Sequence, residues 1–352
     1  MKKLPPRNGS VNKIKISTLV VDGNALYKRG FSATKDEYNH NGKSIGGIYQ
    51  FLTVLRKFLD EDLYHKVYVF WDGEFSGKFR WELYKDYKSS RGKDYINGTK
   101  PEDQDEVFQR QEVFNYLEEL YIRQFFDEKV EADDFIAYYC KTKRDTEKIT
   151  VVTSDRDLSQ LVHENVRMYM LDMKEYVYVH NFKEKFGYHH ENVAIIKILC
   201  GDNSDSIKGV KRLGKETLFD IMPELKERKV ELEEIIARAK ELQEKRILDK
   251  KTRLAVLDNI IEGVTDGVQG KNLYKINKQL VDLTTPLIPE TVINEVNELI
   301  NSPLSDDRSI KNVYRMLKED GLDKKIGQQR YEEYLLPFKK LIEREKKHNI
   351  IN

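Results

Sequence analysis

Three apolar segments of the chain each end in an aspartate. They are Ser17–Asp22, Val67–Asp72 and Ile149–Asp155. Continuous apolar runs of this kind, rich in β-branched and aromatic residues, are typical of strands buried on both faces of a parallel sheet. Between the runs, apolar residues recur at helical spacing over 44–59, 105–124 and 131–143. This alternation predicts a doubly wound α/β domain, in which parallel strands bring their terminal aspartates to one edge of the sheet.

The pattern changes near residue 181. One more pair of strands, over 167–171 and 176–179, precedes a region in which apolar residues keep only the helical period. The charged stretch 231–251, continuing a predicted helix over 231–257, mixes signs at i,i+4 spacing and is typical of a solvated helix face. We therefore predict four parts along the chain. They are a flexible basic arm over 1–15, the α/β domain over 16–185, a helical domain over 186–300 and a helical C-terminal extension over 301–352.

Composition restricts the class of protein but does not identify a partner. The 352 residues are 39% hydrophobic and 34% charged, and 61 basic residues balance 60 acidic ones. No apolar stretch approaches the roughly 20 residues of a membrane helix, and the first residues lack the apolar core of a secretory signal. We expect a soluble protein of the cytoplasm. Cys140 and Cys200 each stand alone in an apolar segment, which predicts small buried hydrophobes.

Acidic residues gather in the segments that follow the predicted strands. Nine of them are candidate metal ligands: Asp22, Asp72, Glu131, Asp133, Asp134, Asp155, Asp157, Asp202 and Asp205. So many carboxylates at one edge would repel one another and take up protons unless cations lay between them. Oxygen ligands without His or Cys favour Mg²⁺ or Mn²⁺, and two such ions about 3.5 to 4 Å apart promote phosphodiester hydrolysis. Any single acid pair, taken alone, is more often a surface patch or a helix cap.

Basic and aromatic residues alternate in the segment after the second strand. Between Ser76 and Lys100, seven basic residues outnumber three acidic ones and are interleaved with five aromatic residues. Cations neutralise phosphates and rings stack on bases, so this segment could hold a nucleic-acid strand over the acidic edge. The alternative is an ordinary solvated loop or helix.

A glycine-flanked basic turn follows the last acid pair. Gly209 and Gly214 enclose Val210-Lys211-Arg212-Leu213, and a predicted helix begins at Lys215. Such a turn can point its backbone N–H groups outward, and the helix N-terminus behind it favours phosphate. The pattern predicts duplex binding without sequence preference, although helix capping alone would also explain the two glycines.

In these motifs the chain resembles the structure-specific 5′ nucleases, the flap endonuclease family, and among them the bacteriophage 5′-exonucleases, also called phage ribonuclease H. The resemblance spans about Ile16–Pro289, in the family's order and spacing. It rests on Val21-Asp22-Gly23-Asn24, Phe70-Trp71-Asp72-Gly73, Tyr87-Lys88-Ser89-Ser90-Arg91, Val130-Glu131-Ala132-Asp133-Asp134, Thr153-Ser154-Asp155-Arg156-Asp157-Leu158, Gly201-Asp202-Asn203-Ser204-Asp205 and Gly209-Val210-Lys211-Arg212-Leu213-Gly214. It implies a mostly parallel, twisted sheet with flanking helices, a PIN-like 5′-nuclease core, followed by a helical C-terminal domain.

The resemblance also implies a role for each motif. A first metal site would use Asp22, Asp72, Glu131 and Asp133, with Asp134 nearby, and a second would use Asp155, Asp157, Asp202 and Asp205. A helical arch over about 76–104 would place Lys88 and Arg91 on the scissile phosphate and stack Tyr87 on a base near the cut. The turn resembles the helix-three-turn-helix that grips duplex DNA, often with bound K⁺. Further implied nucleic-acid contacts are Lys85, Lys93, Lys208, Gly209, Lys211, Arg212, Gly214 and Lys215. Ser206 departs from the family pattern, since many relatives have Asn there.

Residues and resemblance together predict a Mg²⁺-dependent 5′ to 3′ exonuclease and flap endonuclease, with Mn²⁺ able to replace Mg²⁺. We expect a monomer that acts on 5′ flaps, nicked duplex DNA or RNA primers in RNA–DNA hybrids during DNA replication, alongside proteins such as single-strand-binding protein. A phage origin would place it in the cytoplasm of a bacterial host. Two alternatives stay open: a PIN-type ribonuclease, which lacks the basic arch and the glycine-flanked turn, and a DNA-structure-binding protein without catalytic activity.

Overall fold

The computed structural model describes residues 16–34, 36–91, 103–265, 272–304, 308–327 and 330–351. The predicted arm over 1–15 lies outside these ranges, as do Lys93 and residues 92–102 of the predicted arch. The side chain of Arg91 also lies outside the described atoms, although its backbone is described.

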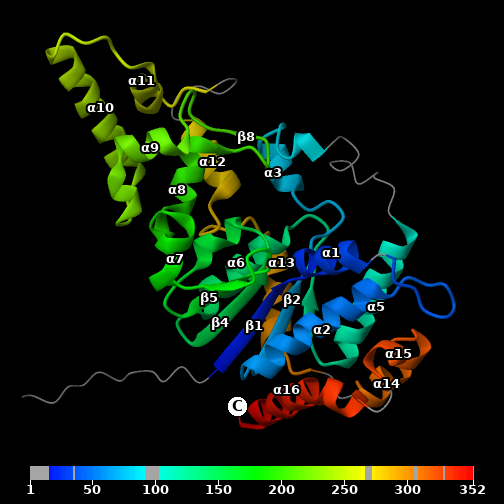
Figure 1. The fold of residues 1–352 in the computed structure, drawn as a ribbon. Coiled ribbons are helices and arrows are strands. Elements are labelled where there is room, and N and C mark those ends of the chain that lie inside the picture. Colours follow the sequence, from blue (N-terminus) through cyan, green and yellow to red (C-terminus); the bar gives the residue numbers. More distant parts are fainter. Residues whose placement is uncertain are drawn as a thin grey trace, which may run out of the picture.

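A six-stranded sheet forms the centre of the molecule (Figure 1). Its strands are β1 (Ile16–Asp22), β2 (Lys66–Phe70), β3 (Arg123–Phe125), β4 (Glu147–Thr153), β5 (Val166–Met170) and β6 (Glu175–Val177), in the spatial order β3-β2-β1-β4-β5-β6. All neighbouring strands are parallel except β5 and β6. The mostly parallel sheet predicted from the apolar runs is therefore confirmed, as is the strand pair that follows them.

Helices cover both faces of this sheet because successive residues of its strands point to opposite sides. On β1, Leu19 and Val21 pack in one apolar cluster with α1 (Gly23–Thr34), α2 (Gly46–Glu61) and α5 (Gln104–Glu119). The intervening Val20 packs in a second cluster with α6 (Ala132–Lys143) and α13 (Glu290–Asn301). Both faces of the strand are thus buried, which explains its continuous apolar sequence.

A helical region continues from the sheet (Figure 1). It contains α7 (Val179–Phe186), α8 (Val193–Cys200), α9 (Lys215–Ile221), α10 (Leu232–Leu248), α11 (Ala255–Glu262) and α12 (Asn272–Val281). A small ribbon of β7 (Gly201–Asp202) and β8 (Ile207–Lys208) joins α8 to the glycine-flanked turn. The buried amide of Asn277 on α12 donates to the carbonyls of Ile198 and Lys208, at 2.9 Å each, and so fixes this ribbon against α8. The single helix predicted over 231–257 is wrong, because the chain leaves helix after Leu248 and α11 begins at Ala255.

The C-terminal extension packs back onto the α/β part. Its helices α14 (Ile310–Glu319), α15 (Asp323–Ile326) and α16 (Tyr331–Ile351) bury Leu317, Leu335 and Phe338 in the same cluster as α2 and α5. Across the described ranges, every helix is too short or too polar to cross a bilayer.

Candidate active site

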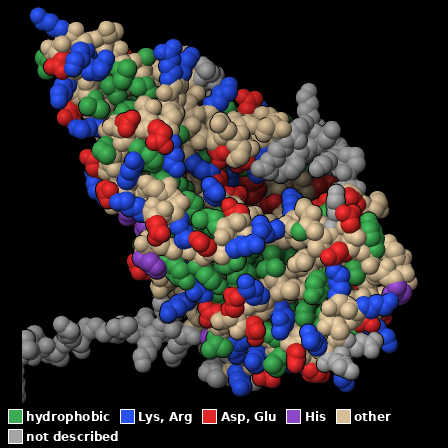
Figure 2. Space-filling view, in the orientation of Figure 1, with side chains coloured by type: hydrophobic (Ala, Val, Ile, Leu, Met, Phe, Trp, Pro, Cys, Tyr) green, Lys and Arg blue, Asp and Glu red, His purple; other side chains and the backbone are tan. Residues whose placement is uncertain are grey.

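The carboxyl ends of β1, β2 and β4 open into a cleft of about 1100 Å³. Acidic side chains collect in a recess between the sheet and the helical region (Figure 2). Seven of the nine predicted ligands line the cleft: Asp22, Asp72, Glu131, Asp133, Asp155, Asp157 and Asp202. An eighth, Asp205, lies beside them, with its carboxylate within 4.8 Å of those of Asp157 and Asp202. The structure thus brings together acids that are spread over almost two hundred positions of the sequence.

Backbone amides and hydroxyls hold the first carboxylates in place. Asp22 accepts the Ala25 N–H at 2.9 Å and the Thr153 hydroxyl at 2.8 Å. The same hydroxyl accepts the Asp155 N–H at 2.9 Å, so it connects the ends of β1 and β4. These bonds leave the remaining lone pairs of the carboxylates available to cations in the cleft.

Asp72 is held in a comparable way at the end of β2. It accepts the Ala132 N–H at 2.9 Å, at the start of α6, and the Asn24 amide at 2.7 Å, at the start of α1. The N-terminus of α6 and a side chain from the start of α1 therefore both bind this carboxylate, and the dipole of α6 favours its negative charge.

Burial and mutual repulsion disfavour the ionised form of these acids when no cation lies between them. Burial raises the pKa of Asp22 to about 7, and the charges of Asp72 and Asp155 add to the rise. Burial also raises the pKa of Asp133 well above its ordinary value, with further contributions from Asp155, Asp22 and Asp72. Divalent cations would relieve both effects, and an oxygen-only donor set fits Mg²⁺ or Mn²⁺.

Glu131 differs from its neighbours because two cations of the chain already face it. Its carboxylate pairs with the Arg80 guanidinium at 2.5 Å and with the Lys88 ammonium. Burial alone would raise the pKa of Glu131, but Lys88 and Arg80 outweigh burial and lower it to about 2. Glu131 is therefore held as a carboxylate at the edge of the cleft.

The structure corrects the prediction for Asp134. Its carboxylate is 1% exposed, binds the Arg80 guanidinium at 2.6 and 3.0 Å, and accepts the Leu287 N–H at 2.9 Å. It lies outside the cleft because consecutive residues at the start of α6 point in different directions, so only Asp133 reaches the metal side. We therefore remove Asp134 from the predicted ligands.

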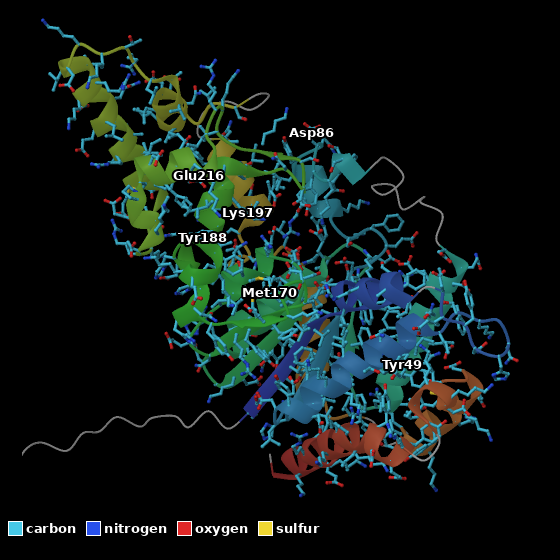
Figure 3. The ribbon with its side chains drawn as sticks, in the orientation of Figure 1. Tyr49, Asp86, Met170, Tyr188, Lys197 and Glu216 are labelled. Atoms are coloured by element: carbon cyan, nitrogen blue, oxygen red, sulfur yellow. The ribbon has the colours of Figure 1, made fainter. Side chains whose placement is uncertain are left out.

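A second group of acids gathers around Lys197, which the sequence reasoning missed. Its ammonium contacts the carboxylates of both Asp157 and Asp202. Burial and then the charge of Asp155 raise the pKa of Asp157 to about 6, whereas Lys197 lowers the pKa of Asp202 although burial opposes it. Figure 3 shows Lys197 and Tyr188 close together in the helical region and Asp86 farther away, beside α3. Of the three, Lys197 and Tyr188 line the cleft. The available signal was a single cation within the otherwise apolar segment Val193–Cys200, directly before Asp202.

The arch begins with α3 (Lys78–Leu83) and the short helix η1 (Ser89–Arg91). Lys88 lines the cleft, whereas Lys85 is exposed and lies over the Trp81 ring, 3.7 Å from its centroid. Tyr87 requires a correction. It is only 4% exposed, and its hydroxyl donates to the Glu131 carboxylate at 3.2 Å. The ring is therefore a core residue that supports Glu131 and cannot stack on a base in this arrangement.

The glycine-flanked turn presents exposed Lys208, Lys211, Arg212 and Lys215 together with exposed Gly214. A Cβ on Gly209 would lie 2.2 Å from the carbonyl carbon of Cys200, so only glycine fits this close passage. The prediction of outward amides is wrong for part of the turn. The Val210 N–H donates to Leu199 at 2.7 Å and the Lys211 N–H to Val264 at 2.8 Å, so the protein itself uses both donors.

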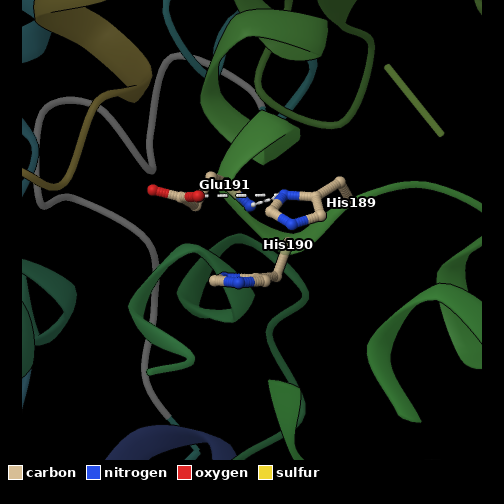
Figure 4. A group of neighbouring side chains, drawn as sticks. All are labelled: His189, His190 and Glu191. Carbon is tan, nitrogen blue, oxygen red and sulfur yellow. Dashed lines mark hydrogen bonds and ion pairs between the residues drawn. The ribbon is translucent and has the colours of Figure 1, made fainter. Parts of the chain in front are cut away.

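A histidine cluster lies near this site but outside the cleft (Figure 4). His189, His190 and Glu191 form a single turn, η3 (His190–Asn192) with its preceding residue, and their ligand atoms lie within 4.8 Å of one another. The Nδ1 of His189 already accepts the Glu191 N–H at 3.4 Å and lies 3.9 Å from its carboxylate. We assign no function to this cluster.

Comparisons with known proteins agree with this geometry. Residues 17–187 match the family model of the 5′-3′ exonuclease N-terminal, resolvase-like domain. The chain is 28% identical to DNA polymerase I of Bacillus subtilis over 312 residues, which cover 84% of this chain and 34% of that protein. It is 25% identical to the 5′-3′ exonuclease of Buchnera aphidicola over 209 residues, which cover 58% of this chain and 69% of that one.

Among solved structures, the bacteriophage T5 5′-exonuclease with bound divalent metal ions (zinc) superposes with a TM-score of 0.59 at 18% identity, over 86% of this chain and 97% of that one. A T5 flap endonuclease complex with DNA and metal ions gives a TM-score of 0.55 at 19% identity, over 86% and 99% of the two chains. The chain spans about a third of the length of the B. subtilis polymerase. These matches confirm the fold class and the family resemblance predicted from the motifs.

Proposed function

We propose that the chain is a Mg²⁺-dependent 5′ nuclease acting on branched or nicked duplex DNA, because residues 17–187 match the family model of the 5′-3′ exonuclease N-terminal domain. The observation that carries the proposal is the arrival of Asp22, Asp72 and Asp155 from three strand ends in one cleft. The raised pKa of Asp22, to about 7, supports a site that is completed by cations. A T5 flap endonuclease solved with DNA and metal ions supports the same substrate class and cofactor class here.

We propose that the carboxylates form two sets of ligands, one for each of two ions. In this proposal, Asp22, Asp72, Glu131 and Asp133 would hold one ion, and Asp155, Asp157, Asp202 and Asp205 would hold the other. The carboxylates of Asp157, Asp202 and Asp205 lie within 4.8 Å of one another, which supports the second set. Two divalent cations bound there would supply an activated water for attack on phosphorus and would stabilise charge on the leaving oxygen. We propose Mg²⁺ as the natural ion, with Mn²⁺ able to replace it.

Cations of the chain complete the environment of the reacting phosphate. Lys88 lies in the cleft against Glu131, on the arch side. A divalent ion held by Glu131 would share the charge of that carboxylate, so the Lys88 ammonium would be held less firmly and could turn to a phosphate oxygen. We assign Arg91 a similar role from the sequence.

The basic turn is the proposed contact for the duplex. Lys208, Lys211, Arg212 and Lys215 are exposed. Of these, Lys215 lines the cleft and lies 4.2 Å from the centroid of the Tyr188 ring. Sequence-independent attraction to phosphates requires only such clustered cations. We propose that the turn works as a helix-three-turn-helix, with K⁺ as a further ion, and that the protein serves DNA replication alongside single-strand-binding protein.

A substrate panel tests the proposal. End-labelled 5′-flap, nicked and RNA-primed duplexes, with matched single-stranded RNA and DNA, are incubated with Mg²⁺ or with EDTA. We expect 5′ products from the branched or nicked duplexes in Mg²⁺ and none in EDTA. Preferential cleavage of single-stranded RNA would favour a PIN-type ribonuclease instead. Tight flap binding without products in either Mg²⁺ or Mn²⁺ would indicate a non-catalytic binding protein.

A further inference from the structure

The base of the arch is hydrogen-bonded to the loop that carries the last two acids. The Lys88 N–H donates to the Asp205 carbonyl at 2.8 Å. The Ser90 N–H donates to the Ser206 hydroxyl at 3.2 Å, and that hydroxyl lies 3.2 Å from the Ser90 hydroxyl oxygen, to which it donates. The backbone of Lys208, at the end of the same loop, bonds to the Tyr84 hydroxyl. Segments more than a hundred residues apart in sequence are therefore joined beside the cleft.

Both joined positions have unusual backbone conformations. Lys88 has φ of 53° and Ser206 has φ of 58°, in the left-handed region that few residues other than glycine and asparagine adopt. Such conformations persist where surrounding contacts hold them. Here the holding contacts are the hydrogen bonds between the two segments.

Each segment also carries a group that faces the cleft. The Lys88 ammonium contacts Glu131 of the first acid group. Asp205, directly before Ser206, places its carboxylate with Asp157 and Asp202 of the second group. The orientation of Lys88 and the position of the second acid group therefore depend on the same set of hydrogen bonds.

Resting on the proposed nuclease function, we propose that Ser206 is a positioning residue that ties the arch, and with it Lys88, to the loop of Asp202 and Asp205. Its hydroxyl is suited to the task because it both accepts from the Ser90 amide and donates to the Ser90 side chain. Because these hydrogen bonds join the loop to the base of the arch, a movement of the loop also moves the arch. Cation binding to the second acid group and the alignment of Lys88 are therefore coupled. Ser206 itself touches neither substrate nor ion in this assignment.

Substitutions at position 206 separate the hydroxyl from the backbone conformation. Ser206→Ala removes the hydrogen bonds and keeps the side chain small. Ser206→Asn supplies a carbonyl acceptor and suits the left-handed conformation, whereas Ser206→Thr keeps the hydroxyl but places a β-branched side chain at positive φ. Ser89→Ala is the matched control, because Ser89 lies in the same short helix and none of the described side chains bonds to its hydroxyl.

The first measurement is single-turnover cleavage of a 5′ flap in Mg²⁺, with flap affinity measured separately in EDTA. Ser206→Ala should lower the cleavage rate constant about three- to tenfold with little change in affinity, as expected for one or two exposed hydrogen bonds. Ser206→Asn should restore the rate, Ser206→Thr should not, and Ser89→Ala should match the parent protein. Weakened affinity with an unchanged rate constant would overturn the proposal.

The second measurement does not require activity. Hydrogen exchange of a peptide covering 84–91 reports the Lys88 and Ser90 amides, which are the donors of the tie. Ser206→Ala should speed their exchange, whereas Ser89→Ala should not. Equal exchange in the parent protein and Ser206→Ala would overturn the tie even in an active enzyme. Failure of the parent protein to cleave any substrate would instead refute the nuclease function and leave this result standing.

Discussion

Asp155 stands where the two groups of acids meet. It accepts the Asp157 N–H at 2.7 Å, and its own N–H binds the Thr153 hydroxyl that also reaches Asp22. Asp155→Ala should lower Mg²⁺-dependent cleavage by more than about a hundredfold, since even loss of a group that only supports a metal ligand costs about 10- to 100-fold. Flap affinity measured by gel shift in EDTA should change little. Asp145→Ala, at an exposed acid outside the cleft, is the control, and undiminished cleavage by Asp155→Ala would refute the metal site.

Lys88 is expected to act on the chemical step. Its ammonium faces Glu131 inside the cleft, whereas Lys85 on the same arch is exposed and lies over Trp81. Lys88→Ala should slow single-turnover cleavage by about a hundredfold or more, as for loss of a donor to transition-state charge. Lys85→Ala should weaken flap binding and leave the rate constant at saturation unchanged. Equal effects of the two substitutions on the rate constant would contradict a contact between Lys88 and the reacting phosphate.

The stability of the metal-free protein should depend on pH through Asp22. Burial raises its pKa from 3.8 to about 7 in the folded state. The folded state therefore gains stability that is full below pH 3.8 and is lost as pH rises to about 7, a difference of about 4 kcal/mol. In EDTA, the melting temperature should fall between about pH 5 and pH 8, and Mg²⁺ should remove the fall. Asp22→Asn should make the fall smaller, with the remainder coming from Asp133 and Asp157, whose pKa values burial also raises. A flat profile of the parent protein in EDTA would contradict the assignment.

At the scale of elements, short apolar runs were the most informative part of the sequence. Strands β1, β2 and β4 were predictable because burial on both faces gives each strand a mostly apolar run without alternation of polar and apolar residues. The break between α10 and α11 was not, since Asp249-Lys250-Lys251-Thr252 contains neither glycine nor proline. Contacts from α10 help to hold this loop, among them the Arg246 guanidinium donating to the Thr252 carbonyl and the Gln243 side chain bonding to the Leu254 backbone. The sequence also suggested Asp134 as a metal ligand near Glu131, although Glu131 only caps α6 and Arg80 binds both carboxylates. The sequence alone does not show that Arg80 is the buried partner of these two acids.

The glycine-flanked turn should contribute to affinity through charge alone. Lys211 and Arg212 are exposed, and Arg212 has φ of 63°, so the two side chains project from a fixed bend. Replacing both by alanine should reduce the slope of log affinity against log salt by about 2, if each neutralises one phosphate. Fluorescence anisotropy with a nicked duplex over a salt series gives the slope. Lys318→Ala with Lys324→Ala, on exposed positions of the C-terminal helices, is the matched control, and an unchanged slope in the turn variant would exclude the turn from the interface.

Across the whole molecule, one apolar cluster connects the sheet to the helical region. It includes Val20 of β1, Leu199 of α8, Ile260 of α11 and Val296 of α13. The second cluster likewise joins the opposite face of the sheet to the C-terminal helices. The acidic loops at the cleft therefore rest on a continuous packed interior, which favours a fixed spacing between the two groups of carboxylates.

The C-terminal extension should stabilise this arrangement through a buried ion pair at the edge strand β3. Arg123 lies 2.5 Å from the Glu345 carboxylate of α16, with side-chain exposures of 2% and 5%, and donates to the Ser302 carbonyl at 3.2 Å. Glu345→Ala leaves the buried guanidinium without its counter-charge and should lower the free energy of unfolding by about 3 to 5 kcal/mol. Urea denaturation followed by circular dichroism measures the change.

Two variants decide whether the lost charge or the lost packing causes that change. Arg123→Leu combined with Glu345→Leu removes both charges and should recover most of the stability, because a buried pair gains little over apolar side chains of similar volume. Glu319→Ala breaks an exposed pair with Arg315, whose side chains are 64% and 66% exposed, and should cost less than about 0.5 kcal/mol. If Glu345→Ala lowered the free energy of unfolding as little as Glu319→Ala does, the ion pair with Arg123 would not anchor α16. The extension would then cover the sheet edge through the apolar contacts of Leu335 and Phe338 instead.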